Sequence, residues 1–196
     1  IVFSDHNKPI ARVWLADGTI TPVSVIRSIG HRFHFFSNGD DNPHPEFFDR
    51  QIKAFGEDIQ KALGKLRVGI VGLGGTGSAV AEQLIRLGVG TLYLFDHDTF
   101  ESTNINRIYG SRISDAGKNK VDIISRLAEE IGLGTSVKSF CKSISYKTAI
   151  EELKKCDVVF GCTDDHWGRS ILCRLALYYY IPIFDMGVKV DSENGQ

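Results

Sequence analysis

The sequence contains no apolar run that approaches the roughly 18 residues needed to span a bilayer, and it does not begin with a signal-peptide pattern. It also lacks an excess of charge of either sign, because 23 lysines and arginines stand against 24 aspartates and glutamates. These absences argue against a membrane protein and against nucleic acid or a membrane surface as a partner. We therefore expect a soluble protein.

Cysteine pairing is absent as well. None of the four cysteines forms a CxxC pair: Cys141, Cys156, Cys162 and Cys173. Because nothing suggests secretion, we interpret them as reduced thiols and expect a cytoplasmic location. His31 and His34, three apart in a strand-like run, would point to opposite faces, so we assign no metal site to them.

Residues 1–45 predict a small β segment and a linker. Asp17-Gly18 separates two runs rich in β-branched residues, HRFHFF adds a third strand-like run, and Pro22 places its strand at an edge. Residues 37–45 collect Asn, Gly, Asp and Pro and predict a loop. The sequence begins with Ile and stops just after an apolar run, where we expect a further strand. We therefore interpret it as a fragment.

Residues 46–196 predict the main domain. From Glu46, apolar residues at helical spacing predict one amphipathic helix: Ile52, Phe55, Ile59 and Leu63. Short apolar runs then alternate with amphipathic segments up to IPIFD. Strands separated by helices of this length favour a parallel sheet with helices on both faces. We expect a doubly wound, Rossmann-like α/β fold.

The segment GLGGTG, residues 72–77, fits GxGxxG between a predicted strand and a predicted helix. Glycine lets a phosphate approach the backbone, and a helix N-terminus offers free N–H groups and a favourable dipole. The next strand ends at Asp96, 19 residues after Gly77, where a carboxylate can accept hydrogen bonds from ribose. A tight turn without a ligand is the structural alternative, but this context favours a nucleotide site.

The segment from residue 96 to residue 120 is too long and too polar for a plain connection. It carries several polar and charged residues: Asp98, Asn104, Asn106, Arg107, Lys118 and Lys120. A nicotinamide dehydrogenase needs an apolar slot and no such group of cations. A triphosphate attacked at its α-phosphorus needs cations to hold charge that moves to the leaving pyrophosphate. The segment therefore favours ATP.

Five elements in one order resemble the ThiF/MoeB/HesA adenylyltransferases and the adenylation domains of ubiquitin-activating enzymes: GLGGTG, FDHDTFESTNINR, AGKNK, GCTDD and IPIFDMGV. The resemblance covers about residues 47–196. It implies an enzyme that uses ATP and Mg²⁺ to convert the C-terminal carboxylate of a ubiquitin-like or sulfur-carrier protein, or of a peptide, into an acyl-adenylate with release of pyrophosphate. It also implies a homodimer.

The resemblance further implies site residues. The nucleotide would be bound by the glycine turn, by acidic strand ends and by polar residues of the long segment: Gly72, Gly74, Gly75, Gly77, Asp96, Asp98, Asn104, Arg107, Lys120, Asp164 and Asp165. Catalysis would depend on three cations and one carboxylate: Arg50, Arg107, Lys120 and Asp164. Asp164 would hold Mg²⁺ with ATP, and Arg50 would reach the site of the partner subunit.

Three positions depart from the family pattern. Thr103 replaces its serine, Ile108 its glutamine and Asp165 its asparagine, so we expect altered metal or adenine contacts rather than lost activity.

Structural alternatives remain for the charged residues. Arg107, Lys120 and Arg50 could be solvated surface charges, and Asp164 with Asp165 could cap a helix that begins near His166.

Other residues have simpler interpretations. We interpret Cys162 as a buried thiol rather than a thioester nucleophile, and Trp167 with Tyr178-Tyr179-Tyr180 as packing residues. The nucleophilic cysteine and the zinc-binding CxxC pairs of family members lie beyond the position of Gln196, so a structural zinc is possible only from residues past it.

The first 45 residues weakly resemble the tail of a JAB/MPN isopeptidase domain through ARVWLADG and PVSVIRSIG, but they lack its metal-binding elements, so we assign no protease activity. The hypothesis is therefore an adenylyltransferase of the ubiquitin-activating type. Two alternatives remain open, an NAD-dependent oxidoreductase and a non-catalytic scaffold that binds a ubiquitin-like protein.

Overall fold

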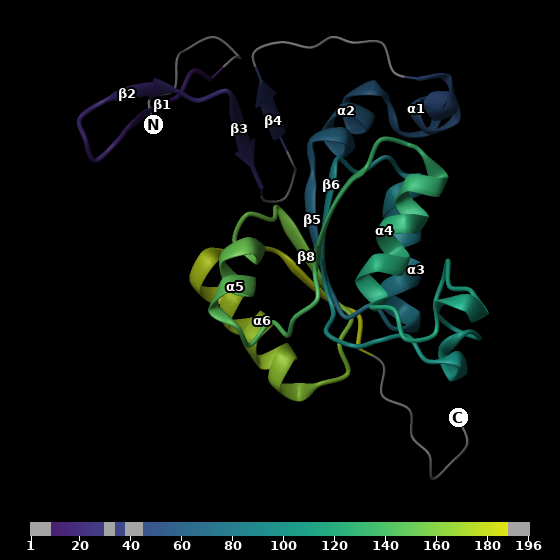
Figure 1. Ribbon diagram of the computed structural model, residues 1–196. Coiled ribbons are helices and arrows are strands. Elements are labelled where there is room, and N and C mark those ends of the chain that lie inside the picture. The colour runs from purple at the N-terminus through teal and green to yellow at the C-terminus, as the bar shows by residue number, and fades with distance from the viewer. Residues whose placement is uncertain (1–8, 30–33, 38–44, 188–196) are drawn as a thin grey trace. The chain divides into compact units, whose positions relative to one another are not determined.

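The computed structural model describes residues 9–29, 34–37 and 45–187 (Figure 1). The chain divides into two compact units, Ile1–Ala62 and Leu63–Gln196. Residues 38–44 of the predicted loop at residues 37–45, and His31, lie outside the described residues. Among the described helices, none has both the length and the apolar character that a membrane crossing requires.

The first unit contains two small antiparallel sheets. Strands β1 (Arg12–Trp14) and β2 (Ile20–Pro22) form a hairpin, and β3 (Val25–Ser28) pairs with β4 (His34–Ser37). The turn of the hairpin contains Gly18 with φ +82°, while the Asp17 carboxylate accepts hydrogen bonds from the Thr19 amide at 2.9 Å and hydroxyl at 2.6 Å. The predicted β element is confirmed.

The helical segment that follows is broken at Gly56. A short 3₁₀ turn, η1 (Glu46–Phe48), leads into α1 (Asp49–Phe55), and α2 (Glu57–Lys65) follows. The prediction of one continuous helix is wrong. Gly56 adopts φ +91° and ψ 156°, a conformation that glycine reaches without steric cost and that no helix contains.

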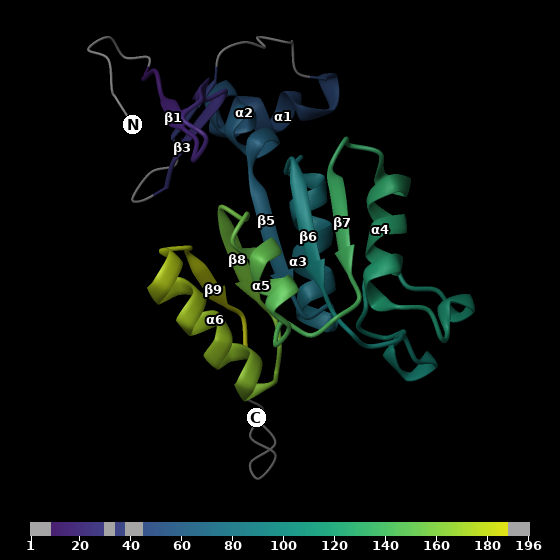
Figure 2. The ribbon, with the colours of Figure 1, turned by 60° about the vertical axis from the view of Figure 1, so that its left-hand side comes forward.

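The second unit is built on a five-stranded sheet in the order β7-β6-β5-β8-β9 (Figure 2). All four strand pairs are parallel. The strands are β5 (Arg67–Val71), β6 (Thr91–Phe95), β7 (Ser136–Phe140), β8 (Val158–Gly161) and β9 (Ile183–Asp185). The predicted Rossmann-like α/β fold is confirmed.

Helices cover both faces of this sheet. Figure 1 shows α3 (Gly75–Arg86) and α4 (Lys120–Ile131) on one face, with α5 (Lys147–Leu153) and α6 (His166–Tyr179) on the other. The central strands are therefore apolar on both sides: Val68, Ile70 and Leu92 share one face and are fully buried, while Val71 and Phe95 on the other face are 4% and 1% exposed. The chain crosses to the second face after β7, so the strand order reverses between β5 and β8.

The aromatic residues of α6 do not all contribute to packing. The buried positions of α6 are Gly168, Leu172 and Leu175. Trp167, Tyr178 and Tyr180, the residue after the helix end, are 59%, 77% and 89% exposed. Tyr179 is 48% exposed, and its ring lies 4.8 Å from the Lys154 ammonium. The prediction of packing residues is therefore wrong for Trp167, Tyr178 and Tyr180.

Candidate functional site

The glycine turn connects β5 to α3. Gly72 has φ +87°, and its amide donates to the carbonyl of Phe95 at 2.8 Å, which ties the turn to β6. A Cβ on Gly77 would overlap the carbonyl oxygen of Gly72, so this glycine permits close packing of helix against strand. A Cβ on Gly74 would meet nothing within 4 Å. The backbone at Gly74 is therefore open, as a phosphate-binding turn requires.

The turn forms one wall of a cavity of about 420 Å³ at the carboxyl ends of the strands, beside the point where the strand order reverses. Ligands of open α/β sheets bind at this place. The lining residues come from the last residues of β5 and β6, from the segments that follow all five strands, and from the starts of α3, α4 and α6: Val71, Gly72, Gly74, Gly75, Thr76, Phe95, Asp96, His97, Asp98, Arg107, Lys120, Lys142, Ser143, Ile144, Cys162, Thr163, Asp164, Asp165, Gly168, Met186 and Gly187.

Asp96 is fixed by backbone amides at the end of β6. Its Oδ2 accepts from the Leu73 amide at 2.6 Å, and its Oδ1 accepts from the Asp98 amide at 2.8 Å. The residue is only 7% exposed, yet it lines the cavity. Each carboxylate oxygen can accept a second hydrogen bond, so Asp96 both stabilises the glycine turn and can bind a hydroxyl in the cavity.

Lys120, the first residue of α4, forms an ion pair with Asp98. The distance between Nζ and Oδ2 is 2.7 Å, and the lysine side chain is only 11% exposed. The hydrogen bond from Lys120 lowers the pKa of the Asp98 carboxyl. The pair brings the predicted lysine to the cavity wall across 22 residues of sequence.

Arg107 lies against the glycine turn. A Cβ on Gly75 would stand 3.4 Å from the Cβ of Arg107, and the Nη1 of Arg107 donates to the carbonyl of Thr103 at 3.3 Å. Its guanidinium has no carboxylate partner among the described residues. Arg107 is therefore a second cation at the cavity wall, close to the start of α3.

Two predicted nucleotide contacts, Asn104 and Gly77, do not line the cavity. Asn104 is buried, and its backbone carbonyl oxygen accepts hydrogen bonds from the backbone amides of Arg107 and Ile108, each at 3.1 Å. Ile108, at the position of the family's glutamine, packs with Phe100 and Ile123. In this structure these residues shape the segment that carries Arg107, and their contact with a nucleotide stays a prediction.

Asp164 and Asp165 follow β8 and have different surroundings. The Asp165 side chain caps α6, because it accepts from the amides of Gly168 at 2.8 Å and Trp167 at 3.1 Å. These hydrogen bonds, that from Gly168 first, lower the pKa of the carboxyl. The Asp164 carboxylate has no hydrogen-bond partner among the described residues, although it lines the cavity. The capping alternative thus applies to Asp165 and leaves Asp164 free to bind a ligand.

The residues present suit a nucleotide with Mg²⁺. Mg²⁺ is commonly held by one or two carboxylates together with phosphate oxygens, and Asp164 offers an unpartnered carboxylate in the lining of the cavity. Asp96, His97 and Asp98 bring three ligand atoms within 4.8 Å of one another, but Asp98 is already paired with Lys120. Asp164 therefore remains the better candidate.

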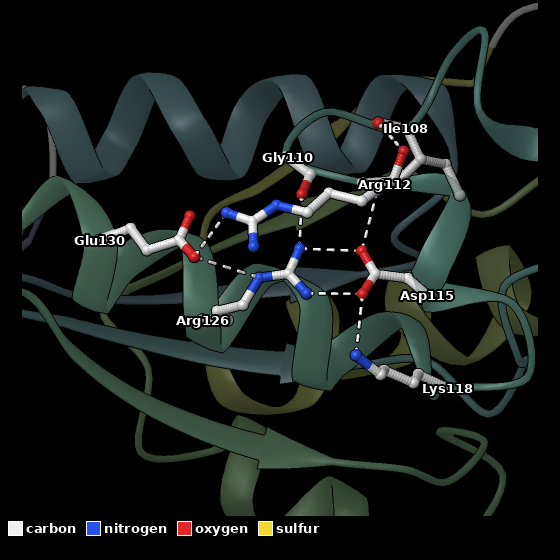
Figure 3. Close-up of polar contacts among 8 residues, drawn as sticks. Ile108, Gly110, Arg112, Asp115, Lys118, Arg126 and Glu130 are labelled. Atoms are coloured by element: carbon white, nitrogen blue, oxygen red, sulfur yellow. Dashed lines mark hydrogen bonds and ion pairs between the residues drawn. The ribbon is translucent and has the colours of Figure 1, made fainter.

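An ionic cluster around the buried Asp115 supports the segment between β6 and α4 (Figure 3). Asp115 is fully buried and accepts hydrogen bonds from Arg126 on α4, from the Lys118 ammonium and from the Arg112 amide. These contacts, with Arg126 the strongest, hold the pKa of Asp115 far below its usual range. Arg126 also donates to the carbonyl of Gly110 at 2.7 Å. The cluster thus fastens the segment to α4.

Several cavity residues were not predicted. Lys142, Ser143 and Ile144 follow β7, and Met186 and Gly187 follow β9. The rule that ligands bind beyond the carboxyl ends of parallel strands could have found them, since both strands were predicted. Cys162 also lines the cavity, but burial raises the pKa of its thiol to about 11, which makes it a poor nucleophile at neutral pH.

Arg50 belongs to the first unit. It lies on α1 and is exposed. Its predicted role in the site of a partner subunit stays a prediction.

Comparison with known proteins identifies the family of the chain. Residues 48–193 match the sequence model of the ThiF family. Ubiquitin-like modifier-activating enzyme 5 of Oryza sativa subsp. japonica is 26% identical over 193 residues, which cover 91% of this chain and 45% of the relative. The protein of the same name from Dictyostelium discoideum is 33% identical over 168 residues, covering 80% of this chain and 44% of the relative.

A solved structure shares the fold. The E. coli tRNA N6-threonylcarbamoyladenosine dehydratase TcdA, crystallised in complex with ATP, has a TM-score of 0.67 and 22% identity, over 76% of this chain and 63% of that chain. The present chain spans less than half the length of the two modifier-activating enzymes. Because the family match includes nearly all of residues 46–196, the chain belongs to the ThiF family.

Proposed function

We propose that residues 46–196 form an adenylation domain that uses ATP to activate the C-terminal carboxylate of a ubiquitin-like protein or a peptide. The observation that carries the proposal is the composition of the cavity wall, where an open glycine turn, the cations Arg107 and Lys120 and the unpartnered Asp164 meet. Membership of the ThiF family, two relatives named as ubiquitin-like modifier-activating enzymes and the ATP complex of TcdA support it.

The start of α3 suits the phosphates of ATP. The amides of the first turn of a helix have no partner within the helix, and the helix dipole favours an anion there by about 0.3–1 kcal/mol. Gly74 leaves the approach to these amides open, and Asp96 stands at the end of the neighbouring strand to accept hydrogen bonds from ribose. In this arrangement the α-phosphorus would face the cavity.

The reaction needs charge stabilisation more than proton transfer. A carboxylate oxygen of the substrate forms a bond to the α-phosphorus of ATP, the bond from that phosphorus to the bridging oxygen breaks, and pyrophosphate leaves. The substrate carboxylate is already ionised at neutral pH, so no general base is required. Arg107 and Lys120 would stabilise the charge on the phosphates. Bound Mg²⁺, held by Asp164, would supply further neutralisation of phosphate charge.

The assembly is also part of the proposal. We infer a homodimer in which Arg50 of each subunit contributes to the site of the other, as the family resemblance implies. We also retain the prediction that residues 1–45 form a separate β segment, which precedes the adenylation domain in the sequence.

ATP–pyrophosphate exchange tests the proposal. The full-length protein is incubated with ATP, labelled pyrophosphate and candidate proteins that end in Gly-Gly. Exchange that depends on such a protein, and that falls at least about 100-fold in Lys120→Ala and Asp164→Ala, would support the proposal. Lys147→Ala, a change at the start of α5 and away from the cavity lining, is the matched control and should leave exchange unchanged. Exchange that neither site variant affects would refute the site.

A further inference from the structure

Ser78 joins the glycine turn to the segment that carries Arg107. It lies on α3, three residues after Gly75, and is fully buried. Its hydroxyl donates a hydrogen bond to the carbonyl of Gly75 at 3.1 Å and accepts one from the amide of Tyr109 at 3.1 Å. One hydroxyl thus connects two parts of the chain that are 31 residues apart.

The bond from Tyr109 is not a local helical bond. A serine in a helix often donates to a carbonyl three or four residues earlier, and the bond to Gly75 is of this kind. The bond that Ser78 accepts comes from a different segment, and among the described residues the Tyr109 amide has no other acceptor. Removal of the hydroxyl would leave this amide unsatisfied, so the bond constrains the backbone two residues after Arg107.

Two further contacts restrict the same backbone. Gly75 lies close to Arg107, since a Cβ built on it would stand 3.4 Å from the Cβ and 3.5 Å from the carbonyl oxygen of Arg107, and Ile108 is 4% exposed in the cluster with Phe100 and Ile123. The guanidinium itself makes one bond, to Thr103. The base of the Arg107 side chain is therefore fixed on the first turn of α3, while its charged end can turn toward the cavity.

We propose that Ser78 is a positioning residue for the adenylation reaction: it holds Arg107 at a set distance from the amides at the start of α3, so that both act on the same phosphates. Ser78 does not line the cavity and touches no reacting group. Its effect passes through Arg107, and the inference rests on the proposed function for the identity of the ligand. Misplacement of a positioned group by about 1 Å can reduce a rate about 100-fold.

A double-mutant cycle tests this coupling. The rate of ATP–pyrophosphate exchange and the dissociation constant for ATP are measured for the full-length protein and for three variants: Ser78→Ala, Arg107→Ala and the double variant. We expect Ser78→Ala alone to lower the rate of pyrophosphate exchange and to raise the dissociation constant for ATP, each about tenfold. In the Arg107→Ala background, the same change should alter each value less than about twofold. Independent, multiplicative effects of the two changes, or no effect of Ser78→Ala alone, would overturn the proposal.

Controls separate the coupling from folding and from the proposed function. Ser125→Ala removes a hydroxyl on α4 that donates to the Val121 carbonyl at 2.9 Å, and it should leave the rate of pyrophosphate exchange unchanged. Circular dichroism checks the fold, and Ser78→Cys, which keeps a weaker donor and acceptor, replaces Ser78→Ala in the cycle if the alanine variant is unfolded.

Amide hydrogen exchange gives a readout without substrate. Ser78→Ala should accelerate exchange at Tyr109 at least about tenfold over Ser125→Ala, because the Tyr109 amide loses its acceptor. Unchanged protection of Tyr109 would refute the link itself. If no carboxylate substrate supports pyrophosphate exchange, the proposed function fails, while ATP affinity and amide exchange still decide the role of Ser78.

Discussion

Arg126 forms a bidentate ion pair with Asp115 through two hydrogen bonds, from Nη1 to Oδ1 at 2.6 Å and from Nη2 to Oδ2 at 2.9 Å (Figure 3). Asp115 is fully buried, and 11 residues of sequence separate the partners. This pair fastens the segment between β6 and α4, in the middle of which Arg107 reaches the cavity, while Lys120 reaches it from the start of α4.

The first prediction concerns the loss of this pair. Asp115→Asn should lower the free energy of unfolding by about 3 kcal/mol, because the change leaves the Arg126 charge without its buried partner. Urea denaturation followed by circular dichroism measures the effect. Glu129→Gln, an exposed change on the same helix α4, is the control and should stay within about 0.5 kcal/mol. Equal stabilities of the two variants would show that the pair does not stabilise the fold.

The second prediction concerns acid. Contacts with Arg126 lower the pKa of Asp115 in the folded state, and contacts with Lys120 lower that of Asp98. A lowered folded pKa contributes stability that is complete above the unfolded value of about 3.9 and is lost as the pH falls through the folded value. The midpoint temperature of unfolding should therefore decrease as the pH falls below about 4, and it should decrease less steeply in Asp115→Asn. A pH dependence identical in both proteins would contradict this account.

The third prediction separates two glycines of the same turn. Gly77→Ala should destabilise the fold, because the new Cβ overlaps the Gly72 carbonyl. Gly74→Ala should leave the unfolding temperature nearly unchanged, since its Cβ enters open space, but should weaken ATP binding by obstructing the phosphates. Calorimetry of unfolding and of ATP binding provides both values. ATP affinity that survives Gly74→Ala would place the phosphates elsewhere.

The fourth prediction concerns thiol reactivity. Burial raises the pKa of Cys162 to about 11 and that of Cys156 to about 12, whereas Cys141 and Cys173 are exposed. Iodoacetamide at pH 8 should therefore modify Cys141 and Cys173 first, as followed by peptide mass spectrometry. Cys162→Ser should retain pyrophosphate exchange. Rapid modification of Cys162, or loss of exchange in this variant, would restore its candidacy as a nucleophile.

Much of the second unit could be predicted from its sequence because two local patterns agree. The apolar runs that became β5 and β6 lie between amphipathic segments, and GLGGTG marks the junction of β5 with α3. Each pattern depends on neighbours close in sequence. The break at Gly56 was missed because an isolated glycine does not reveal its φ angle in advance.

The contacts that shape the site were less accessible from sequence. Ser78 reads as an ordinary residue of a helix, and its bond to Tyr109 exists only because the long segment folds back over α3. Which of Asp164 and Asp165 caps α6, and which is left without a partner, likewise depends on where α6 begins, since the residue before the helix becomes its cap. Such roles depend on tertiary structure.

The most direct test of the central claim is a crystal structure of the full-length protein soaked with ATP. We predict that the triphosphate lies at the amides that begin α3, with the Arg107 and Lys120 side chains on its oxygens and Asp96 on the ribose. A nucleotide bound in another place, or Arg107 and Lys120 directed into solvent while ATP occupies the cavity, would contradict the account.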